Sequence, residues 1–284
     1  MGEAPGTGCA RVVGPALEGF EQFSFASGRD VHPVYYGGHD GDPPLLLLPE
    51  LAGFSPGLRL FAERLIAARF RVHLPWLFGP FGRRAPLRNG IKLCISREFG
   101  YLRAGTSSPV TAWLRALTGH ISSQCGGARV GAIGMCLTGA FVIPLIIDPR
   151  VAAAVAAQPA APLSPLSLLF GVEDGRRASQ LNVSQGEIAA ARERLAGGDA
   201  HLLAVRCRPD RVCPRAKLER LQREFPVGLE VREYAAPEER NSLGERPHAT
   251  FTREYRIVPG ASEEHYSRRA FADLVWFFER HLRG

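Results

Sequence analysis

Residues 131–140 read GAIGMCLTGA, and they place Cys136 where an apolar run typical of a strand gives way to one typical of a helix. Two interpretations of this cysteine are open. Free cysteine behaves as a small hydrophobic residue and is among the most buried residue types, which would make Cys136 a structural thiol. A cysteine at the tip of a strand, on a tight turn into a helix, would instead be a nucleophile. The rest of the chain has to decide between them.

The residues beside Cys136 meet the requirements of such a turn only in part. The strained backbone needs small residues two positions before and two positions after the nucleophile, because larger side chains would collide. Gly134 meets the first requirement, whereas Thr138 stands at the second position and Gly139 follows one place later. This pattern alone therefore leaves both interpretations of Cys136 open.

The composition predicts a globular protein with reduced thiols. The chain has 284 residues, of which 45% are hydrophobic, and this is enough for a sizeable core. We expect a single domain over residues 18–284 and a flexible arm over residues 1–17, which are rich in glycine and proline. The cysteines show neither a CxxC pair nor a zinc-type spacing, so we expect no disulfide framework, no metal and no other cofactor. The six are Cys9, Cys94, Cys125, Cys136, Cys207 and Cys213.

The formal net charge of +7 does not indicate a nucleic-acid partner. Lys92 and Lys217 are the only lysines, so arginine supplies almost all of the positive charge, and the arginines are spread among acidic residues. Nucleic-acid grooves typically combine basic runs with interleaved aromatic residues, and the sequence contains no run of this kind. The N-terminus lacks signal-peptide character, and no apolar run reaches the roughly 20 residues that span a bilayer. We therefore expect a cytoplasmic protein that binds neither nucleic acid nor membranes.

Segments with strand character alternate with segments of helix character along most of the chain. Residues 20–28 and 31–38 predict an antiparallel hairpin at the edge of a sheet, and the apolar run 44–51 is typical of a strand buried on both faces. Alternating strands and helices indicate βαβ units, so we predict an α/β fold with a doubly wound, mostly parallel sheet and helices on both faces. Further strands are expected at 71–77, 129–135, 151–159, 201–210 and 228–235, and helices at 55–70, 107–125, 137–147, 178–198, 213–225 and 263–282.

Four polar residues lie at or beyond the carboxyl ends of predicted strands, where such sheets bind their ligands. Glu50 ends the first buried strand, Cys136 the central one and Asp210 the next to last. His248 follows in the loop after the last strand. The order nucleophile, acid, histidine is the chain order of the triad in α/β-hydrolases.

Asp210 and His248 each have an ordinary alternative role. Aspartate favours turns, so Asp210 could be a turn residue. An acid directly after a strand is also well placed to accept the Nδ1–H of a histidine and to fix its tautomer. His248 could be a surface histidine, yet the other seven histidines precede Cys136 or adjoin regular elements. Position in the chain therefore favours His248 as the base.

The chain resembles the dienelactone hydrolase family of α/β-hydrolases in four short segments, which occur in the family's order. PELAGF at 49–54 is similar to the family's strand-end E-x-x-G segment, and IGMCLTG at 133–139 is similar to its G-x-C-x-G-G turn. PDRVCP at 209–214 is similar to the D-x-x-x-P acid turn, and PHATF at 247–251 to the histidine loop. The resemblance runs from about residue 20 to residue 282.

This resemblance implies the α/β-hydrolase fold and a triad of nucleophile Cys136, acid Asp210 and base His248. It also implies that Glu50 is a buried carboxylate that contacts the nucleophile. The main departure is Thr138, which replaces a glycine of the family's turn. Whether the turn keeps the family's geometry with Thr138 in this place is a question that the sequence leaves open.

The remaining site residues also come from the resemblance. It implies that the backbone N–H groups of Leu51 and Leu137 form an oxyanion hole. The family's arginines that bind a substrate carboxylate match no motif here, and Arg97 and Arg103 are suggested in their place. Segments 78–107 and 160–185 do not read like those of a minimal family member.

The activity implied by the resemblance is hydrolysis of a small ester or lactone through a thioester on Cys136. Two alternatives remain open. One is a hydrolase-like scaffold that binds a ligand or partner without turnover. The fold does not exclude it, because one fold can host many functions, and the departure at Thr138 is the feature in its favour. The other is a redox-sensing thiol protein, which would need a resolving cysteine that the sequence does not show beside Cys136.

Overall fold

The structure is a computed structural model, and it describes residues 12–50, 53–78, 81, 109–160, 179–181, 183–235, 247–257 and 265–283. In these residues the strands form one sheet in the order β1-β2-β4-β3-β5-β6-β7-β8. The β1–β2 and β2–β4 pairs are antiparallel and all other neighbours are parallel, which confirms the predicted hairpin and the mostly parallel sheet. The strands are β1 Glu21–Ser27, β2 Asp30–Gly37, β3 Pro44–Leu48, β4 Arg71–Pro75, β5 Val130–Met135, β6 Val151–Ala157, β7 His201–Cys207 and β8 Leu229–Tyr234.

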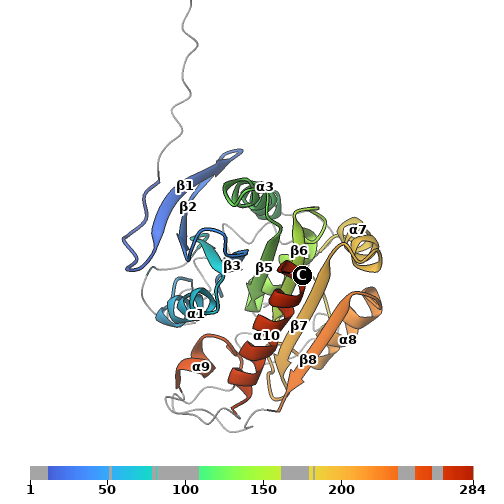
Figure 1. The fold of residues 1–284 in the computed structure, drawn as a ribbon. Coiled ribbons are helices and arrows are strands. Elements are labelled where there is room, and N and C mark those ends of the chain that lie inside the picture. The colour runs from blue at the N-terminus through green and yellow to red at the C-terminus, as the bar shows by residue number, and fades with distance from the viewer. Residues whose placement is uncertain are drawn as a thin grey trace, which may run out of the picture.

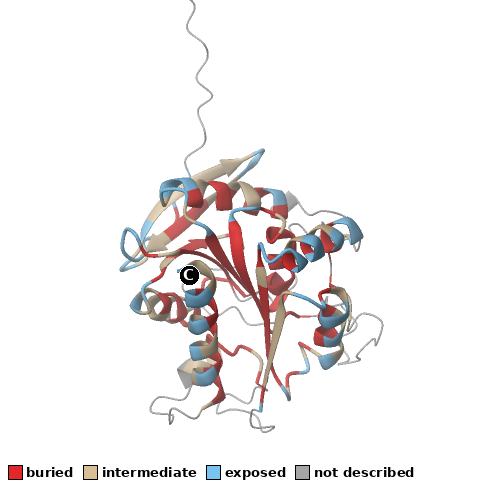
Figure 2. Ribbon diagram, turned by 45° about the vertical axis from the view of Figure 1, so that its right-hand side comes forward, coloured by how far each residue is buried: buried red, intermediate tan, exposed pale blue. Residues whose placement is uncertain are grey.

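Helices cover both faces of the sheet, as the alternating pattern predicts (Figure 1). Helices α1 and α10 pack on one face, and α3, α4, α7 and α8 pack on the other. Burial is concentrated in the central strands and on the inward sides of the helices (Figure 2). The helices are α1 Pro56–Ala67, α3 Pro109–Gln124, α4 Val142–Leu145, α7 Gln185–Ala196, α8 Arg215–Glu224, α9 Arg253–Ile257 and α10 Tyr266–Leu282, with a 3-10 turn at Cys136–Ala140.

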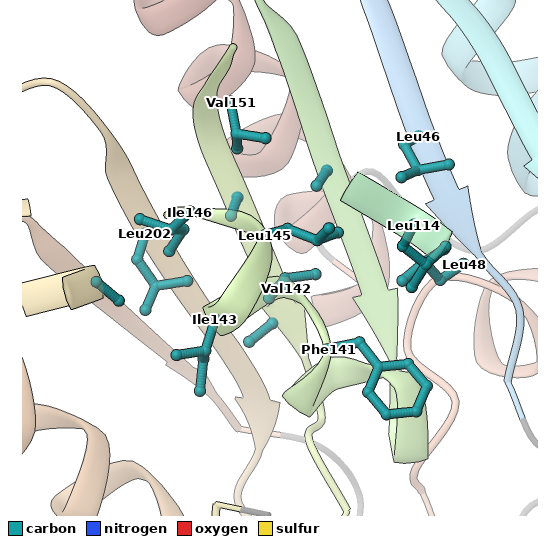
Figure 3. Close-up of a cluster of buried hydrophobic side chains, with 14 of the residues drawn as sticks. Leu46, Leu48, Leu114, Phe141, Val142, Ile143, Leu145, Ile146, Val151 and Leu202 are labelled. Atoms are coloured by element: carbon teal, nitrogen blue, oxygen red, sulfur yellow. The ribbon is translucent and has the colours of Figure 1, made fainter. Parts of the chain in front are cut away.

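Strand β3 shows why its apolar run is continuous. Leu45 and Leu47 belong to the core cluster under α1 and α10, whereas Leu46 and Leu48 belong to the cluster on the opposite face. All four leucines are fully buried, and Figure 3 shows the second cluster, including Leu114 of α3. Burying each leucine contributes about 1.5–3 kcal/mol. This two-sided core fixes the strand ends from which the candidate site residues project.

The start of α1 follows from its sequence. The Ser55 side chain accepts a hydrogen bond from the backbone N–H of Leu58 at 3.2 Å, and Pro56 opens the helix. A serine cap satisfies a donor that the first helical turn leaves unpaired, and proline there loses no helical hydrogen bond. The boundary predicted at residue 55 is thereby confirmed.

The segment 137–147, which we predict as one helix, is broken in the structure. It consists of the 3-10 turn Cys136–Ala140 and the short α4, which contains Pro144. Proline supplies no N–H and its ring collides with the preceding turn of a helix, so a regular helix through this position is disfavoured. The helix α9 is a second difference, since the sequence pattern gives no sign of it.

Part of the predicted arm is hydrogen-bonded to the hairpin. The amide of Gly14 donates to Gln22 Oε1 at 2.9 Å, and Tyr35 donates its hydroxyl proton to the carbonyl of Pro15 at 2.8 Å. Residues 1–11 lie outside the described residues, so the flexibility of the arm over 1–17 stays a prediction.

Candidate active site

Cys136 directly follows β5 and begins the 3-10 turn. Its backbone has a φ of +56°, in the left-handed region that residues with a side chain rarely adopt. Such a conformation costs of order 1–3 kcal/mol, and it persists where the surrounding structure enforces it, commonly at functional sites. The amide of Ala160, beyond β6, donates to the carbonyl of Cys136 at 2.9 Å and helps to hold this turn. The side chain is almost buried, at 8% exposed.

Gly134 is required by the close return of the chain after Cys136. A Cβ at Gly134 would lie 2.2 Å from the carbonyl oxygen of Thr138, which is backbone and cannot move aside cheaply. The need for a small residue two positions before the cysteine is thus a matter of contact with the turn itself. The sequence-based interpretation of Gly134 agrees with this geometry.

Thr138 occupies the position where the family pattern has glycine, and the turn forms around it. Its Oγ1 accepts a hydrogen bond from the amide of Met135 at 2.9 Å. It also lies 3.1 Å from the carbonyl of Pro49 and 2.9 Å from that of Met135, either of which can accept its proton. Thr138 is fully buried. Its hydroxyl therefore links the carboxyl ends of β3 and β5 next to Cys136.

Asp210 and His248 are in direct contact. Oδ2 of Asp210 lies 2.7 Å from Nδ1 of His248, and the aspartate side chain is buried while that of the histidine is 14% exposed. The other carboxylate oxygen of Asp210 accepts hydrogen bonds from the backbone amides of Val212 at 2.8 Å and Cys213 at 3.0 Å. Charge-assisted hydrogen bonds of this kind are strong and directional. The carboxylate is therefore fixed on one side by its own turn and on the other by the histidine.

Cys136 also acts on His248. Burial alone would lower the pKa of His248, yet the Asp210 carboxylate and the Cys136 side chain together raise the pKa of the ring well above its ordinary value. The buried Nε2 has no aligned hydrogen bond to a described residue. Catalytic hydrogen bonds are commonly long or misaligned without substrate, so Nε2 stays available as a candidate partner for the thiol.

Glu50 lies in the loop after β3, two residues beyond the last residue of the strand. Leu48 and Gly134 form the last pair of β3 and β5. Glu50 and Cys136 each follow this pair by two residues along the chain. The buried carboxylate of Glu50 accepts a hydrogen bond from the hydroxyl of Thr252, on the histidine loop. Contact of Glu50 with the nucleophile stays a prediction, since no hydrogen bond joins it to Cys136 in the described part of the chain.

The other expected site residues are described only in part. Leu137 follows Cys136 in the 3-10 turn and is buried, as an oxyanion-hole residue of this turn would be. Leu51, Arg97 and Arg103 lie outside the described residues, as does most of segments 78–107 and 160–185. Their roles stay predictions.

Burial distinguishes the remaining described cysteines from a reactive thiol. It raises the pKa of Cys207 to about 12, the pKa of Cys213 well above its ordinary value, and the pKa of the half-buried Cys125 as well. The thiolate is the nucleophile, so a raised pKa makes a cysteine inert at neutral pH. These three thiols are therefore poor candidates for nucleophilic attack.

Sequence reasoning missed three buried polar residues, of which Thr252 and Arg206 contact site residues. Thr252 holds Glu50, and its only sequence signal is its place four residues after His248. Arg206 interrupts the apolar strand HLLAVRC, and a charge in such a strand is a signal that could have been used. Gln158, just beyond β6, is fully buried with φ +35°, and its amide group has no hydrogen bond to the described residues. A polar residue ending the run VAAAVAAQ was the available signal.

No cluster of three or more His, Cys, Asp or Glu side chains with a metal-binding arrangement occurs in the described ranges. None of the helices in the same ranges combines the length and apolar character that a membrane crossing requires.

Comparison with known proteins finds similarity in solved structures alone. No family model matches the chain, and no curated protein sequence matches it. A Klebsiella pneumoniae protein assigned as a dienelactone hydrolase is similar at a TM-score of 0.62 and 16% identity, covering 92% of this chain and 98% of that one. A Pyrococcus furiosus esterase is similar at a TM-score of 0.60 and 12% identity, covering 96% and 98%.

A third solved structure, a dienelactone hydrolase-like promiscuous phosphotriesterase from metagenomic libraries, is similar at a TM-score of 0.57 and 16% identity. It covers 92% of this chain and 98% of its own. These similarities span nearly the whole of each chain. With the sheet order, they show that the chain has the α/β-hydrolase fold, as predicted.

Replacement of Gly134 by alanine tests the packing of the turn. The new Cβ would collide with the Thr138 carbonyl, so we expect the free energy of unfolding to fall by about 1–3 kcal/mol, as in overpacked cores. Chemical denaturation measures this. Gly186→Ala in α7 is the matched control, because a Cβ there meets nothing within 4 Å. A Gly134→Ala variant as stable as the control would contradict the collision.

The raised pKa of His248 predicts a pH-dependent contribution to stability. The native state holds the proton more tightly than the unfolded chain, whose histidine pKa is about 6.5. This contribution is full below that value and is lost as the pH rises through the native pKa of His248. The difference in unfolding free energy between the native sequence and His248→Gln should therefore be largest near pH 6 and shrink toward alkaline pH. A difference that is constant with pH would contradict the coupling.

Proposed function

We propose that this protein hydrolyses a small carboxylic ester or lactone, with Cys136 as nucleophile, His248 as base and Asp210 as the group that orients the base. One observation supports this above all: a buried aspartate lies 2.7 Å from Nδ1 of a histidine, and a cysteine in strained backbone directly follows the central strand β5. Three elements far apart in the sequence supply these groups. Nucleophile, base and orienting acid are the parts that acyl transfer requires.

The first step of the proposed reaction forms a thioester. In the proposed scheme, Nε2 of His248 takes the proton of the thiol as the base. The sulfur of Cys136 attacks the carbonyl carbon, whose oxygen takes the negative charge. Collapse of this intermediate breaks the bond to the alkoxy oxygen, which leaves with the proton of His248. A lactone opens in the same way and stays attached as a hydroxyacyl thioester.

The second step returns the free enzyme. His248 removes a proton from water, and the oxygen attacks the thioester carbonyl. The carbon–sulfur bond breaks, the carboxylic acid leaves, and the sulfur is again paired with the protonated ring. Asp210 stays ionised throughout, because its role is to fix the tautomer of His248 and to stabilise the positive charge. No cofactor takes part in this scheme.

The negative oxygen of each intermediate needs hydrogen-bond donors. We assign these to the backbone N–H groups of Leu137 and Leu51, as the resemblance to dienelactone hydrolases implies. One such donor contributes about 3 kcal/mol in other acyl-transfer enzymes. In this proposal the bond from Thr252 holds the carboxylate of Glu50 at the histidine loop, beside the nucleophile position.

The proposed substrate class is a small ester or lactone. It is supported by the similar solved structures, which include a protein assigned as a dienelactone hydrolase and an esterase. An acidic substrate is included in the proposal through Arg97 and Arg103, since arginine binds carboxylates with two parallel hydrogen bonds. Nucleic acid and membranes are not partners in this scheme. The proposed place of action is the cytoplasm.

Replacement of Cys136 by alanine tests the proposed nucleophile. With p-nitrophenyl acetate and with dihydrocoumarin as a lactone, we expect kcat/KM to fall by about 10³-fold or more, the scale seen when a nucleophile is removed. Cys125→Ala is the matched control and should keep full activity. Intact-protein and peptide mass spectrometry should show an acetyl group on Cys136 in the native sequence only. Undiminished turnover by Cys136→Ala would contradict the proposal, and no turnover by either protein would favour a binding scaffold.

A further inference from the structure

Arg206 is a charged residue within the buried strand β7. It is 4% exposed, between the fully buried Val205 and Cys207. Burying a charged group is costly unless hydrogen bonds and an opposite charge compensate it. The contacts of this guanidinium therefore show what the residue does.

The guanidinium of Arg206 donates to three backbone carbonyls of the turn that follows β7. Its Nε donates to Cys213 at 2.9 Å, and Nη2 donates to Arg208 at 2.9 Å and to Asp210 at 3.2 Å. Nη1 pairs with the carboxylate of Glu233 on the neighbouring strand β8 at 2.5 Å. The planar group presents its five N–H donors in a fixed fork, so one side chain can hold several points at once. Residues 208–213 form the acid turn that it clamps.

The acid turn carries the carboxylate that orients His248. Cys213 takes part in both sets of bonds, since its amide donates to Asp210 Oδ1 and its carbonyl accepts from Arg206. The carbonyl of Asp210 is itself held by Arg206. A shift of this turn would therefore move the Asp210 carboxylate relative to Nδ1 of His248.

We propose that Arg206 is a positioning residue. Its hydrogen bonds to the carbonyls of the acid turn fix the Asp210 carboxylate against His248. The inference rests on the proposed function, in which Asp210 and His248 serve the nucleophile. Lysine keeps the positive charge but supplies a single ammonium group in place of the fork, so it cannot hold three carbonyls and Glu233 together. Arg206→Lys therefore separates the clamp from the charge.

A matched control is available near the amino ends of the strands, opposite the acid turn. Arg194 of α7 also caps backbone carbonyls, with Nη1 donating to Ile146 at 2.6 Å, to Asp148 and, at 3.4 Å, to Val151. It is partly buried and does not contact the acid turn. Arg194→Lys should lower stability through the same loss of carbonyl contacts and leave the His248 ring unaffected.

The test measures the pKa of His248 by NMR titration of its ring in the native sequence, Arg206→Lys and Arg194→Lys, together with unfolding by denaturant. We expect both variants to be destabilised and only Arg206→Lys to lower the pKa of His248 toward its ordinary value. With p-nitrophenyl acetate, Arg206→Lys should lower kcat by about tenfold or more, with KM within about twofold, because misplacing a catalytic group by a small distance is that costly.

Two outcomes would overturn the inference. One is a folded Arg206→Lys variant with the native His248 pKa and kcat, and the other is an equal fall in the His248 pKa in Arg194→Lys. If Arg206→Lys does not fold, Glu233→Gln replaces it, with a smaller shift of the His248 pKa in the same direction expected and an unchanged pKa overturning the clamp. The titration needs no turnover. If Arg206→Lys lowers the pKa of His248 but the native protein hydrolyses no ester, the proposed function is wrong and the positioning role of Arg206 is supported.

Discussion

The contact of 2.7 Å between Asp210 and His248 is the interaction on which the candidate site depends. It joins the turn after β7 to the loop after β8, two segments that are 38 residues apart in the sequence. Asp210 is also held independently of His248. Asp210 accepts two amides of its own turn, and Arg206 clamps that turn from the strand below. Because the carboxylate is held by its own turn, the ring keeps Nδ1 toward Asp210, and Nε2 is the nitrogen left for the role of base that we propose.

The position of Cys136 is held by a different set of contacts. Cys136 adopts a left-handed conformation, and the strain is sustained by hydrogen bonds at both sides of the turn. Thr138 is part of this support, because its hydroxyl binds the ends of β3 and β5. A residue that departs from the family pattern thus contributes bonds that glycine could not make. Gly134 remains necessary, since the backbone of the same turn occupies the space where its side chain would be.

The sequence predicts the architecture well because the relevant signals are local. The continuous apolar run of β3 and the serine and proline at the start of α1 each report the conformation of their own segment. The predicted positions of Asp210 and His248 follow from a rule about strand ends, and their contact follows from the fold. Their chemical roles stay proposals, as do those of Leu51, Arg97 and Arg103.

What the sequence could not predict depends on partners distant along the chain. The hydrogen bond between Thr252 and Glu50 joins residues 202 positions apart, and the sequence around Thr252 does not predict it. Arg206 is visible as a charge in an apolar strand, but the three carbonyls that it binds belong to a turn whose shape only the structure gives. The helix expected at 137–147 is broken because Pro144 and the strained turn outweigh the apolar spacing of that segment.

The most direct measurement of the central claim is the pKa of His248, determined by NMR in the native sequence and in Cys136→Ala. If sulfur, ring and carboxylate converge at one rim of the sheet, removal of the sulfur should lower this pKa, because Cys136 is one of the groups that raise it. Asp210 would still raise it in the variant. An identical pKa in the two proteins would show that the thiol lies beyond the reach of the ring, and the account of this site would then be wrong.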